Sequence, residues 1–253
     1  MFINNLNPVL LSIGPISIRY YSLVYIIGFL VAYWLLYKVA KEKAVKNLTK
    51  DAVDDFMVYL ILGAVIGGRL FHFIFYNPII IWTDPLEILK IWHGGMSFHG
   101  GLIGALLGYW LFSKKHKVAF YDLADLLMMP LAFFLFLGRI ANFINGELWG
   151  TITNVKWCVV FPQADEFCRH PSQLYEAFYS LGIFFILWFM KAKYKLKKGV
   201  IFWSFVLMYG LFRFIANFWR DVDAVTGQVL SLVMVVIAVV FLYRILKTKH
   251  TKT

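Results

Sequence analysis

The chain has 253 residues, of which 61% are hydrophobic and only 15% are charged, and it carries a formal net charge of +11. Average soluble domains are about half apolar and about a quarter charged. This composition therefore excludes a disordered chain, a collagen-like fibre, a disulfide-rich secreted scaffold and an ordinary soluble globule. It indicates a polytopic membrane protein. In such a protein the positions of the Lys and Arg residues indicate the membrane orientation, so the basic excess does not by itself indicate nucleic-acid binding.

Seven apolar segments approach the length of about 20 residues that crosses a bilayer as a helix. In chain order the predicted spans are 18–37, 52–75, 95–112, 119–138, 173–190, 199–218 and 228–246. Their apolar residues lack the alternation that is typical of a membrane β-barrel. The sequence therefore predicts a single all-α transmembrane domain over residues 1–253, with extramembrane loops near 76–94 and 139–172.

Basic residues gather at alternate ends of these spans. Seventeen of the 25 Lys and Arg residues lie between spans one and two, three and four, or five and six, or at and after the end of span seven. Cytoplasmic segments carry such an excess. We therefore expect the N-terminus outside, the C-terminus in the cytoplasm and a small extracytoplasmic cap at 139–172. The first 17 residues contain no Lys or Arg, so span one is expected to insert as an uncleaved anchor.

Cys158 and Cys168 are the only cysteines, and both fall in the predicted cap. An oxidising compartment permits a disulfide between them, but the sequence leaves open whether one forms. Neither belongs to a nucleophile or CxxC pattern, and no zinc, haem or Walker A pattern is present.

Ionisable residues inside a span are costly and mark a functional site by default. The outer halves of five spans hold polar groups of this kind: Tyr21, Arg69, His99, Arg139, and together Tyr209, Arg213, Asn217 and Arg220. The last four have the spacing i, i+4, i+8, i+11, which predicts one shared helical face. Arginine suits bidentate binding of phosphate, and a phospholipid headgroup supplies phosphate in this solvent. Snorkelling toward the interface is the alternative for Arg213 and Arg220.

Arg139 is followed by Asn142, Asn145 and Glu147. These groups are suited to contact phosphate and glycerol hydroxyls. The alternative is that Arg139 and Glu147 pair with each other while their neighbours shape a loop. On span three, a ridge of small residues that is typical of close helix packing is formed by Gly100, Gly104 and Gly108.

Several sequence runs carry a family resemblance. They are GGRLFHFIFYNP at 67–78, GGMSFHGGLIG at 94–104, GRIANFINGELWG at 138–150, HPSQLYE at 170–176 and YGLFRF at 209–214. With Ile13-Gly14-Pro15, they resemble the bacterial prolipoprotein diacylglyceryl transferases over nearly the whole chain. The resemblance implies a seven-span inner-membrane enzyme whose site faces outward. It also implies transfer of diacylglyceryl from phosphatidylglycerol to the lipobox cysteine of a prolipoprotein, with release of glycerol 1-phosphate and without cofactor or metal.

The resemblance implicates eight residues: Tyr21, His99, Arg139, Asn142, Glu147, Gly150, Tyr209 and Arg213. We add Arg69 and Arg220 as candidate lipid-binding residues because of their depth. The sequence departs from the family at Asn217, where Glu is common. A carboxylate at this position is therefore not essential to the chemistry of this chain, unless Glu147 or another acid substitutes for it.

The implied reaction needs an activated thiol and a stabilised phosphate leaving group. A free cysteine thiol has a pKa near 8.5 and is mostly protonated at neutral pH, so we assign His99 as the proton acceptor. Arg139 and Arg213 are the candidates for stabilising the phosphate. Tyr21 and Tyr209 are candidates for orienting the headgroup or protonating the departing oxygen.

Three other functions stay open from the residues alone. A transporter or channel for an anionic solute would use the same arginines, although the polar residues stop about halfway through the spans. A metal-dependent phospholipid enzyme would use Asp122 and Asp125, which are more simply the charged start of a helix. A lipid-binding or assembly protein would use the same polar residues to bind a lipid without catalysing a reaction.

Overall fold

The computed structural model describes residues 2–13, 16–221 and 224–248. Gly14 and Pro15 of the Ile13-Gly14-Pro15 run, and two of the basic residues near the C-terminus, Lys249 and Lys252, lie outside the described residues. Contacts between Cα atoms divide the chain into two units, residues 1–32 with 124–253 and residues 33–123. We call them the arginine unit and the α2–α4 unit. The chain passes between the two within α1 and α5.

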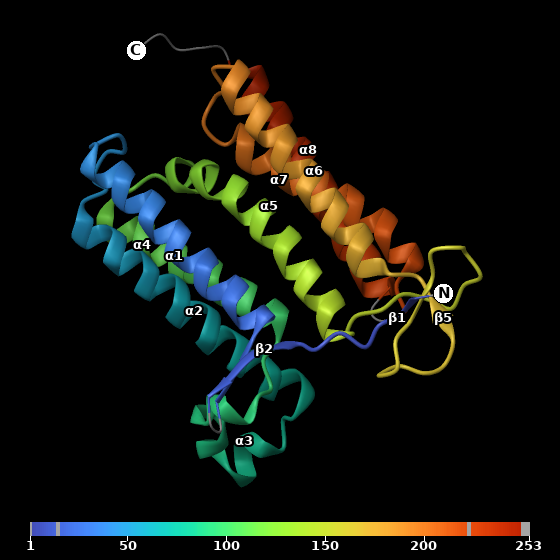
Figure 1. Cartoon of the computed structure of the whole chain (residues 1–253). Helices are drawn as coiled ribbons and strands as arrows, with labels where there is room; N and C mark the ends of the chain where they lie inside the picture. The colour runs from blue at the N-terminus through green and yellow to red at the C-terminus, as the bar shows by residue number, and fades with distance from the viewer. Residues whose placement is uncertain (1, 14–15, 222–223, 249–253) are drawn as a thin grey trace. The chain divides into compact units, whose positions relative to one another are not determined.

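Long helices account for most of the described chain (Figure 1). They are α1 (Tyr20–Lys41), α2 (Lys50–Tyr76), α4 (Phe98–His116), α5 (Phe120–Asn145), α6 (Ser172–Lys193), α7 (Val200–Ala216) and α8 (Ala224–Lys247). Each overlaps one predicted span. Among the described residues, six helices are long and apolar enough to cross a membrane, and α4 is not one of the six. The chain is therefore a mostly helical protein of multi-pass membrane character.

In the arginine unit, α6, α7 and α8 run side by side (Figure 1). A buried apolar cluster joins α5, α6 and α7 through Met128, Ala132, Ile183, Leu187, Ile201 and Phe205. Small residues at helix contacts allow close packing where lipid replaces water. Gly210 does so here, because a side chain at this position would press against the Ser231 carbonyl of α8.

Asp125 of α5 caps the start of α7. Its carboxylate accepts hydrogen bonds from the backbone N–H groups of Gly199 and Phe202, at 2.6 and 2.8 Å. The first N–H groups of a helix have no partner within the helix, so this contact fixes where α7 begins. In the part of the chain that the structure describes, no three His, Cys, Asp or Glu residues are grouped to hold a metal ion.

In the α2–α4 unit, α2 and α4 pack against each other over much of their length (Figure 1). The ridge of small residues on α4 makes this possible. A methyl group on each glycine would overlap one α2 carbonyl oxygen: Gly100 with Gly67, Gly104 with Gly63, and Gly108 with Tyr59. The predicted close packing of this ridge is confirmed.

The segment between α2 and α4 contains α3 (Ile80–Thr83) and the 3-10 turns η1 (Pro85–Leu89) and η2 (Ile91–His93). It enters α4 through Gly94 and Gly95, whose φ angles of +79° and +74° favour glycine. Ser97 then begins α4 by accepting a hydrogen bond from the Gly100 N–H at 3.3 Å.

The described residues also form five short strands that the sequence does not predict, because strands of two to five residues carry little periodicity. β1 (Phe2–Ile3), β4 (Val159–Val160) and β5 (Cys168–Arg169) form a sheet in the order β1-β4-β5. β1 is parallel to β4, and β4 is antiparallel to β5. β2 (Val9–Ile13) and β3 (Ile16–Arg19) form a separate antiparallel pair. The all-α prediction describes the membrane helices and omits these sheets.

Candidate active site

A single buried carboxylate, Glu176 in α6, joins three arginines of the arginine unit. Its Oε2 accepts from Nη2 of Arg139 at 2.9 Å and from Nη1 of Arg213 at 2.5 Å. Its Oε1 accepts from Nη1 of Arg220 at 2.5 Å. Glu176 itself is fully buried. A buried carboxylate is costly unless it is paired and hydrogen-bonded, and the three guanidinium groups meet that need.

The three arginines differ in accessibility. The side chains of Arg139 and Arg213 keep 17% and 18% of their surface exposed, whereas that of Arg220 keeps 4%. Arg139 and Arg213 therefore retain surface for a ligand. Arg220 is committed to the interior, where it holds the opposite oxygen of Glu176.

Arg139 reaches a second acid through an asparagine. Its Nη1 donates to Oδ1 of Asn142 at 3.2 Å, and Nδ2 of Asn142 donates to Glu147 at 2.7 Å. Asn145 also donates to Glu147, at 3.2 Å. The carboxylate paired directly with Arg139 is thus Glu176, and the alternative of a simple Arg139–Glu147 pair is wrong. Among the residues that the structure describes, three guanidinium groups face two carboxylates here, which gives this set of groups an excess of positive charge.

The helix that covers span four extends further than the predicted span. Span four was expected to end at 138, but α5 continues through Asn145 and ends at Gly146, whose φ is +66°. The polar residues from Arg139 to Asn145 are therefore helical, and Asn142 and Asn145 donate to Glu147 in the loop that follows. The cap is therefore the segment between the end of α5 at Asn145 and the start of α6 at Ser172.

The predicted single helical face of span six is also wrong in its second half. α7 ends at Ala216, the residues Asn217–Trp219 form a 3-10 turn, and Arg220 is extended. A 3-10 turn winds more tightly than an α-helix, so the α-helical spacing does not apply beyond Ala216. Arg213 and Arg220 meet because both bind Glu176. Asn217 is buried, and neither polar atom of its side chain has a hydrogen-bond partner among the described residues.

Two tyrosines, Tyr179 and Tyr209, lie beside the cluster. The Tyr179 hydroxyl donates to Oε2 of Glu176 at 3.4 Å, and its ring lies 5.9 Å from that of Tyr209. Tyr209 in turn stacks on Phe205 at 5.7 Å. Tyr21, at the start of α1, shares a hydrogen bond of 2.9 Å with the Tyr25 hydroxyl. Tyr209 is therefore held by aromatic packing beside the arginines.

Gly150 lies where the cap meets the chain after α7. It forms an antiparallel bridge with Arg220, and its N–H donates to the His170 carbonyl at 2.9 Å. A Cβ at this position would overlap the Trp219 carbonyl and the His170 side chain. Only glycine fits this crossing, so the structure gives Gly150 a backbone role.

The start of α6 holds the loop that carries Glu147. The Ser172 hydroxyl donates to the Leu148 carbonyl at 2.9 Å, and Nε2 of Gln173 donates to the Glu147 carbonyl at 2.6 Å. Leu148 has a φ of +59°, an uncommon conformation for a bulky residue. The two contacts hold this strained turn next to the site.

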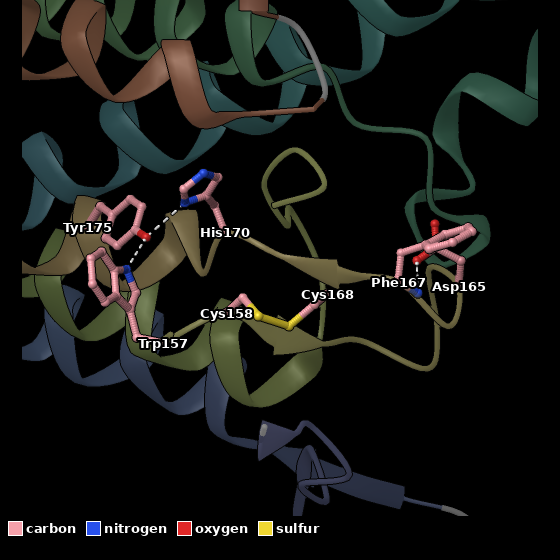
Figure 2. The surroundings of a disulfide bond; sticks show 7 residues. All are labelled: Trp157, Cys158, Asp165, Phe167, Cys168, His170 and Tyr175. Carbon is pink, nitrogen blue, oxygen red and sulfur yellow. Dashed lines mark hydrogen bonds between the residues drawn. A yellow bond between two sulfur atoms is a disulfide. The ribbon is translucent and has the colours of Figure 1, made fainter. Parts of the chain in front are cut away.

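The cap is closed by a disulfide between Cys158 and Cys168, which settles the question the sequence left open (Figure 2). Beside it, the Trp157 indole donates to the Tyr175 hydroxyl at 2.8 Å, and that hydroxyl lies 3.0 Å from Nδ1 of His170. Burial lowers the pKa of His170. The Arg169 guanidinium holds the pKa of Asp165 below its usual range.

Two predicted site residues belong to the α2–α4 unit. Arg69 is buried, and its guanidinium nitrogens donate to the backbone carbonyls of Glu87, Ile88, Lys90, Gly94 and Gly95. Its hydrogen bonds among the described residues thus go to the segment before α4 rather than to acidic side chains. His99 lies exposed in the first turn of α4.

Sequence reasoning missed Glu176 as a site residue. It ends the HPSQLYE run and is the only acidic residue in the predicted span 173–190. An ionisable residue inside a span marks a functional site by default, and this acid meets that criterion as well as the arginines do.

Comparison with known proteins places this architecture in a family. A family model described as prolipoprotein diacylglyceryl transferase matches residues 8–244. A phosphatidylglycerol–prolipoprotein diacylglyceryl transferase of Rickettsia rickettsii (strain Sheila Smith) is 45% identical over 230 residues, covering 90% of this chain and 88% of the relative. The protein of the same name from Rickettsia canadensis (strain McKiel) is 42% identical over 249 residues, covering 94% and 96%. The chain belongs to the prolipoprotein diacylglyceryl transferase family.

Proposed function

We propose that this chain transfers the diacylglyceryl group of phosphatidylglycerol to the lipobox cysteine of prolipoproteins. A carbon–sulfur bond forms, the carbon–oxygen bond to the phosphate breaks, and glycerol 1-phosphate leaves. The observation that carries the proposal is the convergence of Arg139 and Arg213, each partly exposed, on one oxygen of buried Glu176. Family membership favours this reaction over an anion transporter or a metal-dependent lipid enzyme.

The surplus positive charge of the cluster suits the change in charge during the reaction. A phosphodiester carries one negative charge, whereas a phosphate monoester carries about −1.5 to −2 near neutral pH. Fixed guanidinium groups therefore interact more strongly with the departing phosphate than with the intact lipid. Interactions that strengthen on the way to the transition state accelerate the chemical step.

The remaining roles follow from contacts and chemistry. Arg139 and Arg213 bind the phosphate in this proposal, and Glu176 with buried Arg220 holds them in place. Asn142 and Glu147 orient Arg139, while Tyr209 and Tyr21 orient the headgroup. His99 accepts the thiol proton, an assignment that rests on imidazole chemistry and on family resemblance. Arg69 holds the segment that leads into α4.

We place the protein in the bacterial cytoplasmic membrane with seven spans, α4 included. The lysine-rich segments face the cytoplasm by the distribution of basic residues. The cap and the arginine cluster then face the extracytoplasmic side, with the N-terminus outside. Membrane lipids surround the domain, and phosphatidylglycerol and the prolipoprotein signal peptide are its partners. No nucleic-acid partner is proposed.

The direct test uses purified protein, phosphatidylglycerol and a synthetic lipobox peptide, with the peptide analysed by mass spectrometry. We expect a mass gain of one diacylglyceryl group on cysteine and an equal amount of released glycerol phosphate. Phosphatidylethanolamine in place of phosphatidylglycerol and a Cys→Ser peptide are the matched controls, and neither is expected to give product. An unmodified peptide in the complete reaction would refute the proposal.

A further inference from the structure

Strand pairing and a disulfide both hold the cap hairpin between α5 and α6 in its closed form. β4 and β5 pair antiparallel, with Val160 opposite Cys168 and Val159 opposite Arg169. The disulfide ties Cys168 to Cys158 just before β4 (Figure 2). A disulfide that closes a short loop restricts the open forms of that loop. The position of β5 therefore depends on an oxidised cysteine pair.

Arg169, the neighbour of Cys168 in β5, connects the hairpin to the rest of the arginine unit. The residue is buried. Its Nε and Nη2 donate to the Asp165 carboxylate at 3.1 and 2.5 Å. Its Nη1 donates to the Gly150 carbonyl at 3.1 Å and to Asp221 at 2.9 Å. One guanidinium thus contacts the hairpin, the backbone carbonyl of Gly150 and Asp221, the residue that follows Arg220.

The backbone at Gly150 and Thr151 in turn holds the backbone next to and at Arg220. Gly150 and Arg220 form an antiparallel bridge, and the Thr151 N–H donates to the Trp219 carbonyl at 3.0 Å. Arg220 carries the guanidinium that binds Oε1 of Glu176. A continuous set of contacts therefore runs from the disulfide through Arg169 and Gly150 to Arg220, and from there to the carboxylate shared by Arg139 and Arg213.

We propose that Arg169 is a positioning residue for the arginine cluster and that the Cys158–Cys168 disulfide is required to hold it, so that transfer depends on an oxidised cap. This inference rests on the proposed function. Arg169 is not proposed to touch the lipid, because its guanidinium donates to Asp165, Asp221 and the Gly150 carbonyl. It acts through Arg220 on the orientation of Glu176.

The redox step is the oxidation of the Cys158 and Cys168 thiols to a disulfide, and a reductant can reverse it. Formation of the disulfide removes two protons and two electrons from the thiols of Cys158 and Cys168, which a thiol–disulfide oxidant of the extracytoplasmic compartment accepts. In the test, a water-soluble phosphine reverses the step. The phosphine takes an oxygen atom from water and becomes its oxide, while the two sulfurs gain two electrons and two protons.

The first experiment measures kcat and KM for phosphatidylglycerol in Arg169→Ala and Arg169→Lys. We expect Arg169→Ala to lower kcat by about tenfold, with KM changed by less than about twofold and with partial recovery in Arg169→Lys. Lys156→Ala, which removes an exposed cation from the same cap, is the matched control. An unchanged kcat in Arg169→Ala would overturn the proposal, whereas absence of transfer by the parent protein would overturn the proposed function instead.

A double-mutant cycle tests whether Arg169 acts through Arg220. In an Arg220→Lys background, Arg169→Ala is expected to lower kcat by much less than in the parent. Hydrogen exchange gives a second readout, since the Thr151 amide is expected to exchange faster in Arg169→Ala than in Lys156→Ala. Fully additive effects on kcat, or unchanged exchange at Thr151, would contradict the proposed route.

The second experiment reduces the protein, alkylates the thiols and removes the reagents before the assay. We expect the treated parent to lose most of its kcat. The Cys158→Ser/Cys168→Ser variant should have the same low kcat before and after treatment, because the chain contains only these two cysteines. Full activity of the treated parent or of the serine variant would refute the requirement for the disulfide.

Discussion

Arg139 of α5 and Arg213 of α7 donate to the same oxygen atom of Glu176. Two cations that share one acceptor repel each other, and the buried carboxylate between them offsets that repulsion. The arrangement fixes both guanidinium groups before any substrate arrives. Preorganised charge of this kind stabilises a developing anion without reorganisation during the reaction.

Replacing Glu176 with Gln should damage both stability and catalysis. Gln keeps the shape of the side chain but removes the charge, so three guanidinium groups lose their common counter-ion. Removing one partner of a buried ion pair costs about 3–5 kcal/mol. We expect a lower thermal unfolding midpoint in detergent and a large fall in kcat. Glu166→Gln, the same chemical change at an exposed cap residue, should leave both unchanged.

Arg139 and Arg213 should contribute mainly to kcat. Loss of one such donor costs about 10²–10³ in kcat in comparable oxyanion sites, and we expect this range for each Ala variant. Lys keeps the charge but not the planar fork, so the Lys variants should fall between Ala and the parent. Arg244→Ala, at an exposed residue of α8, is the control. Near-parent transfer by Arg139→Ala and Arg213→Ala in stably folded protein would remove the phosphate-binding assignment.

The sequence predicted the helices and most members of the cluster, because apolar length and intramembrane charge are strong local signals. In the described part of the chain, a long helix overlaps each of the seven predicted spans, and six of these helices are long and apolar enough to cross a membrane. The arginine contacts could not be predicted, since the partner of Arg139 lies on another helix and the nearest acid in sequence is Glu147. The position of Arg220 depends on where α7 ends. After Ala216 the chain forms a 3-10 turn instead of continuing the α-helix, and no pattern in the sequence indicates this change.

Arg69 shows a second limit of sequence reasoning. Its depth in span two matched the other arginines, and depth alone made it a lipid-binding candidate. The structure directs its guanidinium to five backbone carbonyls of the segment before α4. Every residue has a backbone carbonyl, so the sequence does not show which carbonyls an arginine will bind. The residue type and its depth in the span therefore could not tell whether Arg69 binds a phosphate or the carbonyls of a loop.

His99→Gln tests the assignment of the thiol base. Gln retains hydrogen bonding but does not accept a proton near neutral pH, and loss of a general base typically costs about 10²–10⁴ in rate. We expect a fall in kcat of this order, measured with the lipobox peptide over a range of pH. His93→Gln, in the segment before α4, is the matched histidine control. Turnover close to the parent's would exclude His99 from proton transfer.

Membrane orientation is testable with single cysteines in the Cys158→Ser/Cys168→Ser background. Glu166→Cys lies in the cap, and Glu42→Cys lies between α1 and α2; both positions are exposed. With the lysine-rich segments inside, a membrane-impermeant maleimide should label intact cells at position 166 and not at 42. After permeabilisation both should react. Labelling at 42 in intact cells would reverse the proposed orientation.

The cap should open more readily as the pH falls, because of His170. Burial lowers the pKa of this imidazole, so the closed cap favours the neutral form. Above the ordinary histidine pKa, near 6.5, both open and closed forms are neutral and cap stability does not depend on this group. As the pH falls below that value, the open form takes up a proton first and the closed form loses stability. The loss levels off once the pH is below the lowered pKa.

Hydrogen exchange at the backbone amides of Gly150 and His170, corrected for the intrinsic effect of pH, measures this opening. Both amides bond within the cap, Gly150 to the His170 carbonyl and His170 to the Thr151 carbonyl. We expect their protection to decrease below about pH 6.5 in the parent and to stay flat in His170→Gln. His93→Gln, which leaves the cap histidine in place, should keep the parent's dependence. An acid-side loss of protection that persists in His170→Gln would assign the effect to another group.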